Sequence, residues 1–508
     1  MGDIQTYSVM NCGSTGVIKD VNPLILPPDA WTFANQVRFD GIEVVQEKPA
    51  KSLLEVDYPV QLLVGWNDGQ ERRLLLSTPK EIYEATHLDH DATKSQVIPK
   101  WSADEASPPV KQNEWTGGSF GGIPYFCAGF GQKPLVLMRD DRGGYKDKFE
   151  ALNHWPDGHS CSVMRHFSNH LIAIKMEVEI KHQDVRDGKV TFRRPFDIMW
   201  SDRAQPGHLP KTWLPAEAGS RAGEIALTDG GDEVVDGVTL GNRFCIYKEE
   251  SIWPIKYVGG NYVFSIGQAI KGVGIMGKNC AVDFNGKNYV FGRDEIFAHD
   301  GWQIDRIFEA RMNRWIFNRI DDKKRHLCHV FMRPSTREIY FCFPVGDSEF
   351  ANMAACYHTD RHTVTLKSFQ TGINTGSIFE FTGSETFGIR RLFVGSSQGI
   401  QEVDVESSLG EFRLEREGID LGQRRAIDFS HNICLYAEGE GSVSVELTST
   451  LPGGATDHKL INYPLNTPFP GLPIEVAGLT HTLRITNHDA TGFKLSGYTI
   501  QFSDKGRY

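Results

Sequence analysis

The sequence predicts an all-β fold class, and three observations lead to it. Fifty-one glycines and 24 prolines in 508 residues supply turn and breaker residues throughout the chain. Stretches with a helical period are scarce. Short runs that alternate apolar and polar residues recur instead, each bounded by Gly, Asp, Asn or Pro. We therefore expect many short strands joined by tight turns.

A loose unit recurs within residues 61–404: an apolar strand, a turn with Gly or Asp, and a second strand that ends in an aromatic residue and an acid. Copies lie at 73–84, 243–253, 287–302, 337–343 and 391–403. In a β-propeller, small antiparallel sheets repeat around a central axis, so that only short, protected sheet edges remain. The repeats thus predict a propeller-like body of roughly six to eight blades. Two stacked sandwiches are the alternative, because no fixed short motif marks the repeats.

Residues 1–60 are predicted to form an extended arm and a β-hairpin platform. The prolines between Gly16 and Trp31 disfavour a helix, and residues 34–49 alternate around the turn Asp40-Gly41, which is a hairpin signature.

Two further elements complete the expected organisation. Residues 306–320 carry the best helical pattern of the chain, so a helix that braces the body is expected there. Its apolar face would comprise Ile307, Met312, Trp315, Ile316 and Ile320. Residues 405–508 show period-two alternation with Gly, Pro and Asn turns, which predicts a small C-terminal β-sandwich domain.

Composition restricts the classes of function. Apolar residues make up 40% and charged residues 23%, the balance of an ordinary folded protein. The formal net charge of −11 disfavours sequence-independent binding of nucleic acid, because that affinity comes mainly from Lys and Arg. Nine scattered cysteines without a Cys-x-x-Cys pair are expected to be reduced core residues. No secretory signal or membrane span is apparent, so we expect synthesis and folding in a cytoplasm.

Motifs that carry chemistry are weak. Gly272-Val-Gly-Ile-Met-Gly277 has the spacing of a dinucleotide-binding loop, yet a strand rather than a helix is predicted to follow it. Asp283-Phe-Asn-Gly286 fits a type I′ turn better than a calcium loop, and His87–Asp91 fits a polar loop better than a metal site. We therefore predict no catalytic, cofactor-binding or metal-binding residues. A glycosidase needs only two facing carboxylates, so motifs do not exclude that class.

Three aromatic side chains could stack on sugars or anchor the packing of the core. They are Trp101, Trp115 and Tyr125, all in a glycine-rich region. Packing is the favoured interpretation.

Several segments resemble the tail nozzle proteins of short-tailed bacteriophages, the tail tubular protein B-like, packaged-DNA stabilisation type. The opening Gly16-Val-Ile-Lys-Asp-Val-Asn-Pro, followed by Leu26-Pro-Pro-Asp-Ala-Trp-Thr-Phe-Ala-Asn-Gln-Val-Arg-Phe-Asp-Gly41, is similar to the start of such proteins. The other similar segments are 195–202, 272–286, 292–301, 415–422 and 506–508.

This resemblance implies a structural virion protein in the viral tail that is not an enzyme and needs no cofactor. Six copies would form a hexameric ring below the portal and the tail adaptor protein. Tail fibres or a tail tip protein would be further partners. The ring would retain packaged viral DNA and conduct it during DNA ejection without sequence-specific binding. Assembly would take place in the host cytoplasm.

A ring of identical subunits needs interfaces that close by rotation, and extended arms can tie neighbours together. We assign this role, as a hypothesis, to an assembly arm between residues 21 and 31. Its residues are Val21, Pro23, Leu24, Leu26, Pro27, Pro28 and Trp31. The alternative function is a receptor-facing propeller that binds or cleaves host surface polysaccharide. An isolated carbohydrate-binding module is the third hypothesis.

Overall fold

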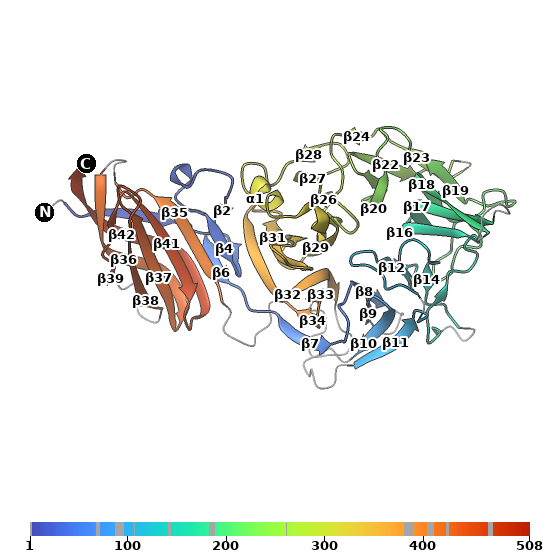
Figure 1. Cartoon of the computed structure of the whole chain (residues 1–508), viewed down its shortest axis with the longest axis horizontal. Helices are drawn as coiled ribbons and strands as arrows, with labels where there is room; N and C mark the ends of the chain where they lie inside the picture. Colours follow the sequence, from blue (N-terminus) through green and yellow to red (C-terminus); the bar gives the residue numbers. More distant parts are fainter. Residues whose placement is uncertain are drawn as a thin grey trace.

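The computed structural model shows a ring of small sheets beside an elongated sandwich (Figure 1). It describes residues 3–67, 72–86, 96–105, 107–140, 144–181, 188–260, 262–379, 390–403, 411–422, 426–465 and 471–507. Both ends of the chain lie on the sandwich, and the ring is built from the middle of the sequence.

Six blades are built from consecutive antiparallel strands, as hairpin-rich sequence predicts, and the sixth belongs to a larger sheet that continues into the sandwich. Blade one comprises β8 (Leu62–Asn67), β9 (Arg72–Ser77), β10 (Glu81–Thr86) and β11 (Gln96–Ser102), and blade two comprises β12 (Thr116–Phe120), β13 (Ile123–Cys127), β14 (Leu135–Val136) and β15 (Glu150–Ala151). Blade three comprises β16 (His159–Phe167), β17 (His170–Lys181), β18 (Lys189–Trp200) and β19 (Gly223–Ala226), and blade four comprises β20 (Val234–Leu240), β21 (Arg243–Lys248), β22 (Ser251–Tyr257), β23 (Phe264–Ile266) and β24 (Ile270–Lys271). Blade five comprises β25 (Ala281–Phe284), β26 (Lys287–Phe291), β27 (Ile296–His299) and β28 (Ile304–Asp305), and blade six comprises β29 (His329–Arg333), β30 (Glu338–Phe343), β31 (Ala351–His358) and β32 (Val364–Phe379).

A seventh blade closes the ring with a strand from far away in the sequence. The second part of β32 pairs with β33 (Arg391–Ser396), which pairs with β34 (Gly399–Glu402). The outermost strand is β7 (Lys51–Glu55), which precedes blade one in the chain. The innermost strands contact one another in the order β8, β12, β16, β20, β25, β29 and β32, and β32 contacts β8. The described residues thus form a closed seven-bladed propeller, and the predicted all-β class with a propeller-like body is confirmed.

The sandwich is built from both ends of the chain. Its first sheet comprises β1 (Gln5–Met10), β5 (Val37–Asp40), β6 (Glu43–Gln46), β36 (Ala426–Glu440), β39 (Leu472–Pro473), β40 (Ala477–Gly478) and β42 (Thr491–Arg507). Its second sheet comprises β4 (Phe33–Asn35), β35 (Arg413–Ile419), β37 (Ser442–Thr450), β38 (Thr456–Pro464) and β41 (Thr480–Asn487). Alternate residues of β37 are buried, as a strand with one face on a core requires.

The domain boundaries therefore differ from those expected. The predicted platform of residues 1–60 is divided: β1, β4, β5 and β6 belong to the sandwich, whereas β7 belongs to the propeller. The predicted boundary at 404–405 falls outside the described residues. The reason for the difference is physical, since a lone N-terminal hairpin has too little apolar surface to be stable and pairs with β42 instead.

The two bodies share a continuous core and a continuous sheet. Strand β4 pairs with β35 of the sandwich and with β32 of the propeller. The largest hydrophobic cluster contains residues of both bodies, including Val44, Phe341 and Leu483.

The expected helix at 306–320 is shorter in the structure. Only α1 (Asn313–Phe317) is α-helical, and the 3-10 helix η2 (Asp322–Leu327) follows. Ala310 has a φ of 55°, the left-handed region that interrupts a right-handed helix. Met312, Ile316 and Ile320 are nevertheless buried, as the apolar pattern predicted.

Two predictions at short motifs are confirmed. The segment after Gly277 continues into strand β25 and not into a helix. Asn285 and Gly286 have φ values of 51° and 77°, and they join β25 to β26 as the two central residues of a type I′ turn.

Candidate functional site

The predicted assembly arm lies on the sandwich of its own chain. Its 3-10 helix η1 (Pro23–Ile25) is capped by Asn22, whose side chain accepts a hydrogen bond from the Leu24 amide. Arg416 of β35 donates to the carbonyl oxygens of Pro23 and Leu26, at 3.0 and 3.3 Å. The arm is therefore held in place within one subunit.

The arm has a buried part and an exposed part. Trp31 is buried and donates from Nε1 to the Cys12 carbonyl at 2.8 Å, and Leu26 is also buried. Leu24 and Ile25 expose 39% and 64% of their surface. Pro27 and Pro28 are exposed, whereas Val21 and Pro23 are half-buried. Only the exposed side chains are available to another subunit, and the assembly role stays a prediction.

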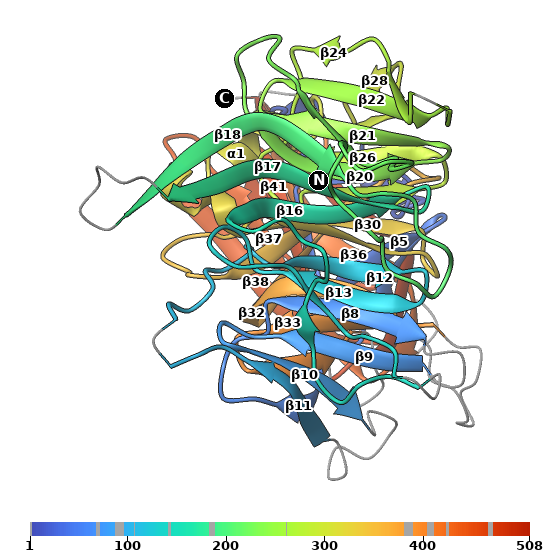
Figure 2. The same ribbon diagram turned by 90° about the vertical axis from the view of Figure 1, so that its right-hand side faces the viewer.

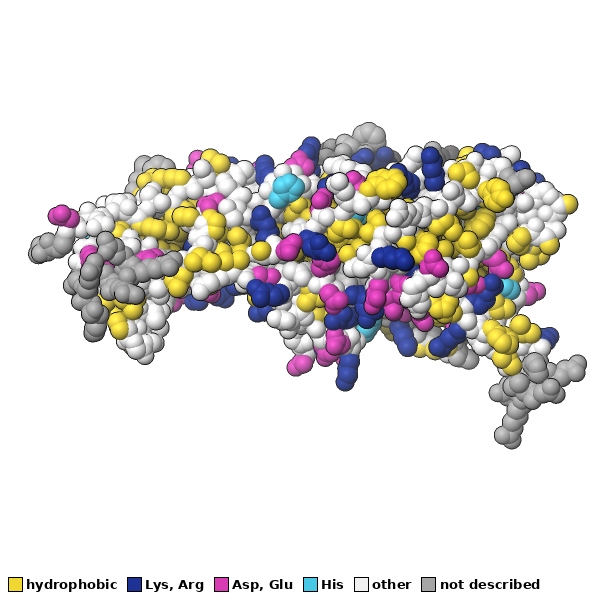
Figure 3. Space-filling view, turned by 90° about the horizontal axis from the view of Figure 1, so that it is seen from above, with side chains coloured by type: hydrophobic (Ala, Val, Ile, Leu, Met, Phe, Trp, Pro, Cys, Tyr) yellow, Lys and Arg dark blue, Asp and Glu magenta, His cyan; other side chains and the backbone are white. Residues whose placement is uncertain are grey.

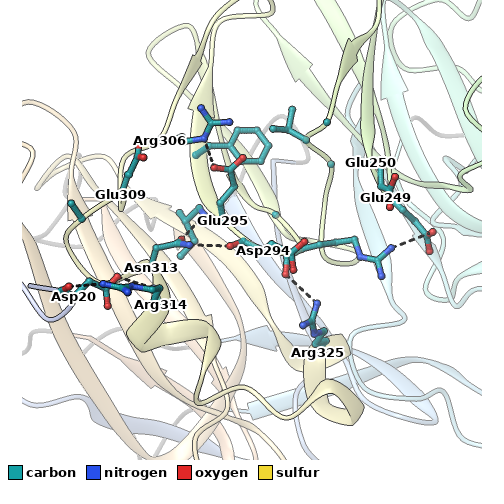
Figure 4. A pocket seen from close by; sticks show the side chains of 18 of the residues that line it. Asp20, Glu249, Glu250, Asp294, Glu295, Arg306, Glu309, Asn313, Arg314 and Arg325 are labelled. Atoms are coloured by element: carbon teal, nitrogen blue, oxygen red, sulfur yellow. Dashed lines mark hydrogen bonds and ion pairs between the residues drawn. The ribbon is translucent and has the colours of Figure 1, made fainter.

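A large cleft lies between blades four and five and helix α1 (Figure 4). It has a volume of about 1070 Å³, and we call it the charged groove. Seven acidic side chains and four arginines line it. Its acidic members are Asp20, Glu249, Glu250, Asp294, Glu295, Glu309 and Asp322.

Three of the four arginines of the charged groove form ion pairs. Arg306 donates from Nε to Glu295 at 2.6 Å, Arg293 lies 3.4 Å from Glu249, and Arg325 lies 2.8 Å from Asp322. Arg314 donates to the Asp20 carbonyl at 2.7 Å.

Three carboxylates of the charged groove, those of Glu250, Asp294 and Glu309, form no ion pair with any residue that the structure describes. The groove thus presents unpaired negative charge.

Two glycines of the dinucleotide-like motif have backbone roles beside this groove. A side chain at Gly274 would place its Cβ 2.2 Å from the Glu249 carbonyl oxygen, and Gly272 has a φ of 81°, in the left-handed region that favours glycine. These roles explain Gly272 and Gly274 without a nucleotide.

The propeller axis contains a smaller cavity of about 350 Å³, which we call the central cavity. Arg165 of blade three forms two hydrogen bonds with Asp236 of blade four, at 2.9 and 2.8 Å. Asp236 also accepts from the Asn279 amide at 2.8 Å, and Arg165 donates to the Asn279 side chain at 2.9 Å. These groups satisfy one another, so they join three blades and leave no free charge for a ligand.

Four titratable groups around the central cavity are shifted toward their neutral forms. Burial raises the pKa of Asp283 and of Tyr125, and burial followed by the Arg165 charge lowers the pKa of His166. Burial also lowers the pKa of His329 to about 4. These four neutral groups, together with the mutually satisfied Arg165–Asp236 pair, fit a structural role for the propeller axis.

The remaining predicted residues pack in the core. Trp115 and Tyr125 are buried, and Trp101 is half-buried against Trp115. All nine cysteines are free, and eight of them are buried. The described part of the chain contains no group of three or more His, Cys, Asp or Glu arranged for a metal, and no helix in it is long and apolar enough to cross a membrane. The motif His87–Asp91 lies outside the described residues.

Sequence reasoning missed the charged groove. Its walls come from four separate segments, around Asp20, 249–250, 272–274 and 292–325. The available signals were the glycine motif and the acidic run Asp294-Glu295, but nothing in the sequence placed one beside the other.

Comparisons with known proteins leave the function open. No family model and no curated protein matches the chain. Among solved structures, virginiamycin B lyase from Staphylococcus aureus covers 72% of this chain and 99% of its own, at 12% identity and a TM-score of 0.38. The Pan2 WD40 domain of Neurospora crassa covers 69% of this chain and 90% of its own, at 9% identity and a TM-score of 0.37. An exo-β-1,3-galactanase from Phanerochaete chrysosporium covers 90% of this chain, at 8% identity and a TM-score of 0.28. These likenesses are too distant to carry an argument about activity.

Proposed function

We propose that this protein is a structural, non-enzymatic tail component of a short-tailed bacteriophage. It would form the tail nozzle, which prolongs the DNA channel below the portal and adaptor. The observation that carries the proposal is the resemblance of segments to nozzle proteins. These segments include residues 16–41, which contain the assembly arm, residues 292–301 in blade five and residues 415–422 in the sandwich.

The physical character of the chain agrees with a conduit. A net charge of −11 disfavours retention of a polyanion that must pass through. The closed propeller and the sandwich share one sheet and one core, so the subunit is suited to bear load without domain motion.

The proposal is tested by electron microscopy of the purified protein and of virions, with symmetry left free. A closed ring at the distal end of a short tail is expected. Two results would contradict the proposal. One is virions that lack the protein, and the other is a protein that forms no ring under any condition in which virions assemble.

The assembly arm is tested by polar substitutions that spare its buried anchor. Leu24→Ser with Ile25→Ser removes the two exposed apolar side chains and leaves Trp31 in place. We expect a folded subunit whose incorporation into tails falls at least about ten-fold, since apolar surface drives most association. Tyr262→Ser, which changes a side chain 83% exposed on blade four, is the matched control. Normal tail assembly with the double variant would show that the arm has no role in assembly.

One observation favours the alternative of a polysaccharide-binding or polysaccharide-cleaving propeller. The charged groove gathers carboxylates from facing blades, and paired carboxylates are what glycoside hydrolysis requires. Glycan arrays and reducing-sugar assays with the natural chain and with Glu295→Gln and Asp294→Asn variants test this alternative. Sugar binding or hydrolysis by the natural chain that is lost in these variants would replace the nozzle proposal.

A further inference from the structure

Two thiols meet at the junction of blades two and three. Cys127 ends β13 of blade two, and Cys161 lies on β16, the innermost strand of blade three. Their Sγ atoms are 3.7 Å apart, and both side chains are fully buried. Figure 2 shows β12 and β13 beside β16, and these strands contact one another. A disulfide bond is about 2 Å long, so the two sulfur atoms need to approach by less than about 2 Å to form one.

The hydrogen bonds of the pair give the two thiols different roles. The Cys127 thiol donates to the Cys161 carbonyl oxygen at 3.6 Å, so the Cys161 thiol is left to donate to the Cys127 sulfur. The hydrogen bond from Cys161 lowers the pKa of the Cys127 thiol to about 7, against the effect of its burial. Burial, followed by the same hydrogen bond, raises the pKa of the Cys161 thiol. Cys127 is therefore the thiol that loses its proton first.

Three further groups stabilise a thiolate at Cys127. The Gly129 amide and the Thr116 hydroxyl donate hydrogen bonds to its sulfur, and the positive charge of Lys278 also lowers its pKa. Lys278 is paired with Glu114, and its side chain is only 12% exposed. A cysteine of lowered pKa beside hydrogen-bond donors and a cation has the surroundings of a reactive thiol.

The burial of the pair restricts the oxidant. Neither side chain exposes any surface, whereas acidic and basic side chains are interspersed over the propeller on the face that Figure 3 shows. Hydrogen peroxide is uncharged and nearly as small as water, so a brief local opening of the structure admits it, and bulky or charged oxidants stay outside. We propose that Cys127 and Cys161 form an oxidation site, at which hydrogen peroxide converts the two thiols to a disulfide that joins blades two and three.

The oxidation proceeds in two displacements. The Cys127 thiolate attacks one oxygen of the peroxide, the O–O bond breaks, and Cys127 becomes a sulfenic acid while hydroxide leaves. This hydroxide takes the proton of the Cys161 thiol and becomes water. The Cys161 thiolate then attacks the Cys127 sulfur, the S–O bond breaks, and the second hydroxide recovers the proton that Cys127 lost at the start. The two thiols together lose two electrons, and one peroxide is reduced to two water molecules.

The disulfide restricts the unfolded chain. It joins positions that are 34 residues apart, and closing such a loop lowers the entropy of the unfolded state. We expect the unfolding equilibrium constant of the oxidised chain to be smaller than that of the reduced chain by a factor on the order of 100. Both cysteines belong to one subunit, so the site does not depend on the tail assignment.

Mass spectrometry of the full chain tests the site. Reduced protein is treated with hydrogen peroxide under native conditions, the remaining thiols are alkylated in urea, and the protein is digested. We expect two peptides joined through Cys127 and Cys161 and released by dithiothreitol. The link should form at least about ten-fold faster than Cys245 is oxidised, since Cys245 is a fully buried thiol whose pKa burial raises to about 12.

Serine variants separate the roles of the two thiols. Cys161→Ser is expected to lose the link and to leave a sulfenic acid at Cys127, which dimedone traps. Cys127→Ser should lose both the link and the dimedone label. Cys245→Ser is the matched control and should form the link at the rate of the natural chain. If a serine variant fails to fold, the measurement on the natural chain still decides, because it needs no substitution.

Three results would overturn the site. One is a natural chain in which Cys127 and Cys161 stay reduced under a peroxide treatment that oxidises Cys245. Another is a link that forms only in urea, because the folded pair is then unreactive. The third is an oxidised chain that unfolds at the same urea concentration as the reduced chain, because the bond then does not hold the two blades together.

Discussion

At the scale of single residues, a buried ion pair fixes the point where the chain passes from sandwich to propeller. Lys367 of β32 lies 2.8 Å from Glu47, and both side chains are buried. Lys367 also donates to the Tyr340 hydroxyl at 2.6 Å. Burial acts to lower the pKa of Lys367, but Glu47 and other acidic groups together hold that pKa well above its usual value.

Removing one partner of this pair should be costly. Lys367→Met leaves the Glu47 carboxylate buried beside an apolar side chain, so we expect a loss of about 3 kcal/mol in the free energy of unfolding. Urea unfolding followed by circular dichroism measures it. Lys459→Met, an exposed lysine on β38, should change stability by less than about 0.5 kcal/mol. Equal effects of the two substitutions would show that the pair contributes nothing.

A second residue makes the stability of the sandwich depend on pH. Burial, followed by the charges of Asp420 and Asp504, raises the pKa of the fully buried Asp428 to about 6. The unfolded value is about 3.9, so between pH 4 and 6 the folded state binds the proton more tightly. The contribution of Asp428 is therefore favourable at low pH and is lost as the pH rises through 6.

Asp428→Asn should remove that dependence. We expect the variant to be more stable than the natural chain at pH 7, by on the order of 2 kcal/mol, and equal to it near pH 4. Thermal unfolding between pH 4 and 7 measures the difference, with Asp3→Asn, an exposed position, as control. A difference that is the same at every pH would contradict the assignment to Asp428.

At the scale of elements, the N-terminal segment stabilises a helix more than 290 residues away in the sequence. Asp20 accepts hydrogen bonds from the amides of Arg314 and Trp315, at 2.7 and 2.9 Å. The Asp20 amide donates in turn to the Arg311 carbonyl at 2.9 Å. These bonds supply α1 with a cap that its own residue Met312 does not provide.

Loss of this cap should loosen the junction. Asp20→Ala is expected to lower the free energy of unfolding by about 1 kcal/mol and to speed amide hydrogen exchange at the start of α1. Glu217→Ala, an exposed acid on the propeller, is the matched control and should leave exchange in α1 unchanged. Unaltered exchange after Asp20→Ala would mean that other contacts hold the helix.

At the scale of the whole molecule, the seventh blade depends on β7. Leu53 and Leu54 of that strand are almost fully buried against the neighbouring blades. Leu53→Ala with Leu54→Ala in the full chain removes this buried apolar surface and leaves Glu47 beside Lys367. Each buried leucine contributes about 2 kcal/mol.

We therefore expect the double variant to unfold at a clearly lower urea concentration, with at least about 3 kcal/mol less stability, and to be cleaved faster by proteases. Circular dichroism during unfolding and limited proteolysis measure both effects. Equal midpoints for the variant and the natural chain would show that these two side chains contribute nothing to the closure of the propeller.

The local properties of the chain were determined by its sequence. Alternation and turn residues gave the all-β class and the hairpins, and Asn285-Gly286 formed the expected turn because both residues tolerate positive φ at little cost. The apolar pattern correctly predicted the burial of Met312, Ile316 and Ile320, whereas Ile307 and Trp315 are half-buried. It did not predict the buried Phe308 or the length of the helix.

The tertiary structure alone decided which strands are neighbours. Pairing of β7 with β34, and of the N-terminal strands with β42, depends on complementary surface contributed by residues hundreds of positions away. Period two specifies a strand and its two faces but not its partner. For the same reason the charged groove became visible only in three dimensions, because it depends on which segments lie beside one another and not on any one segment.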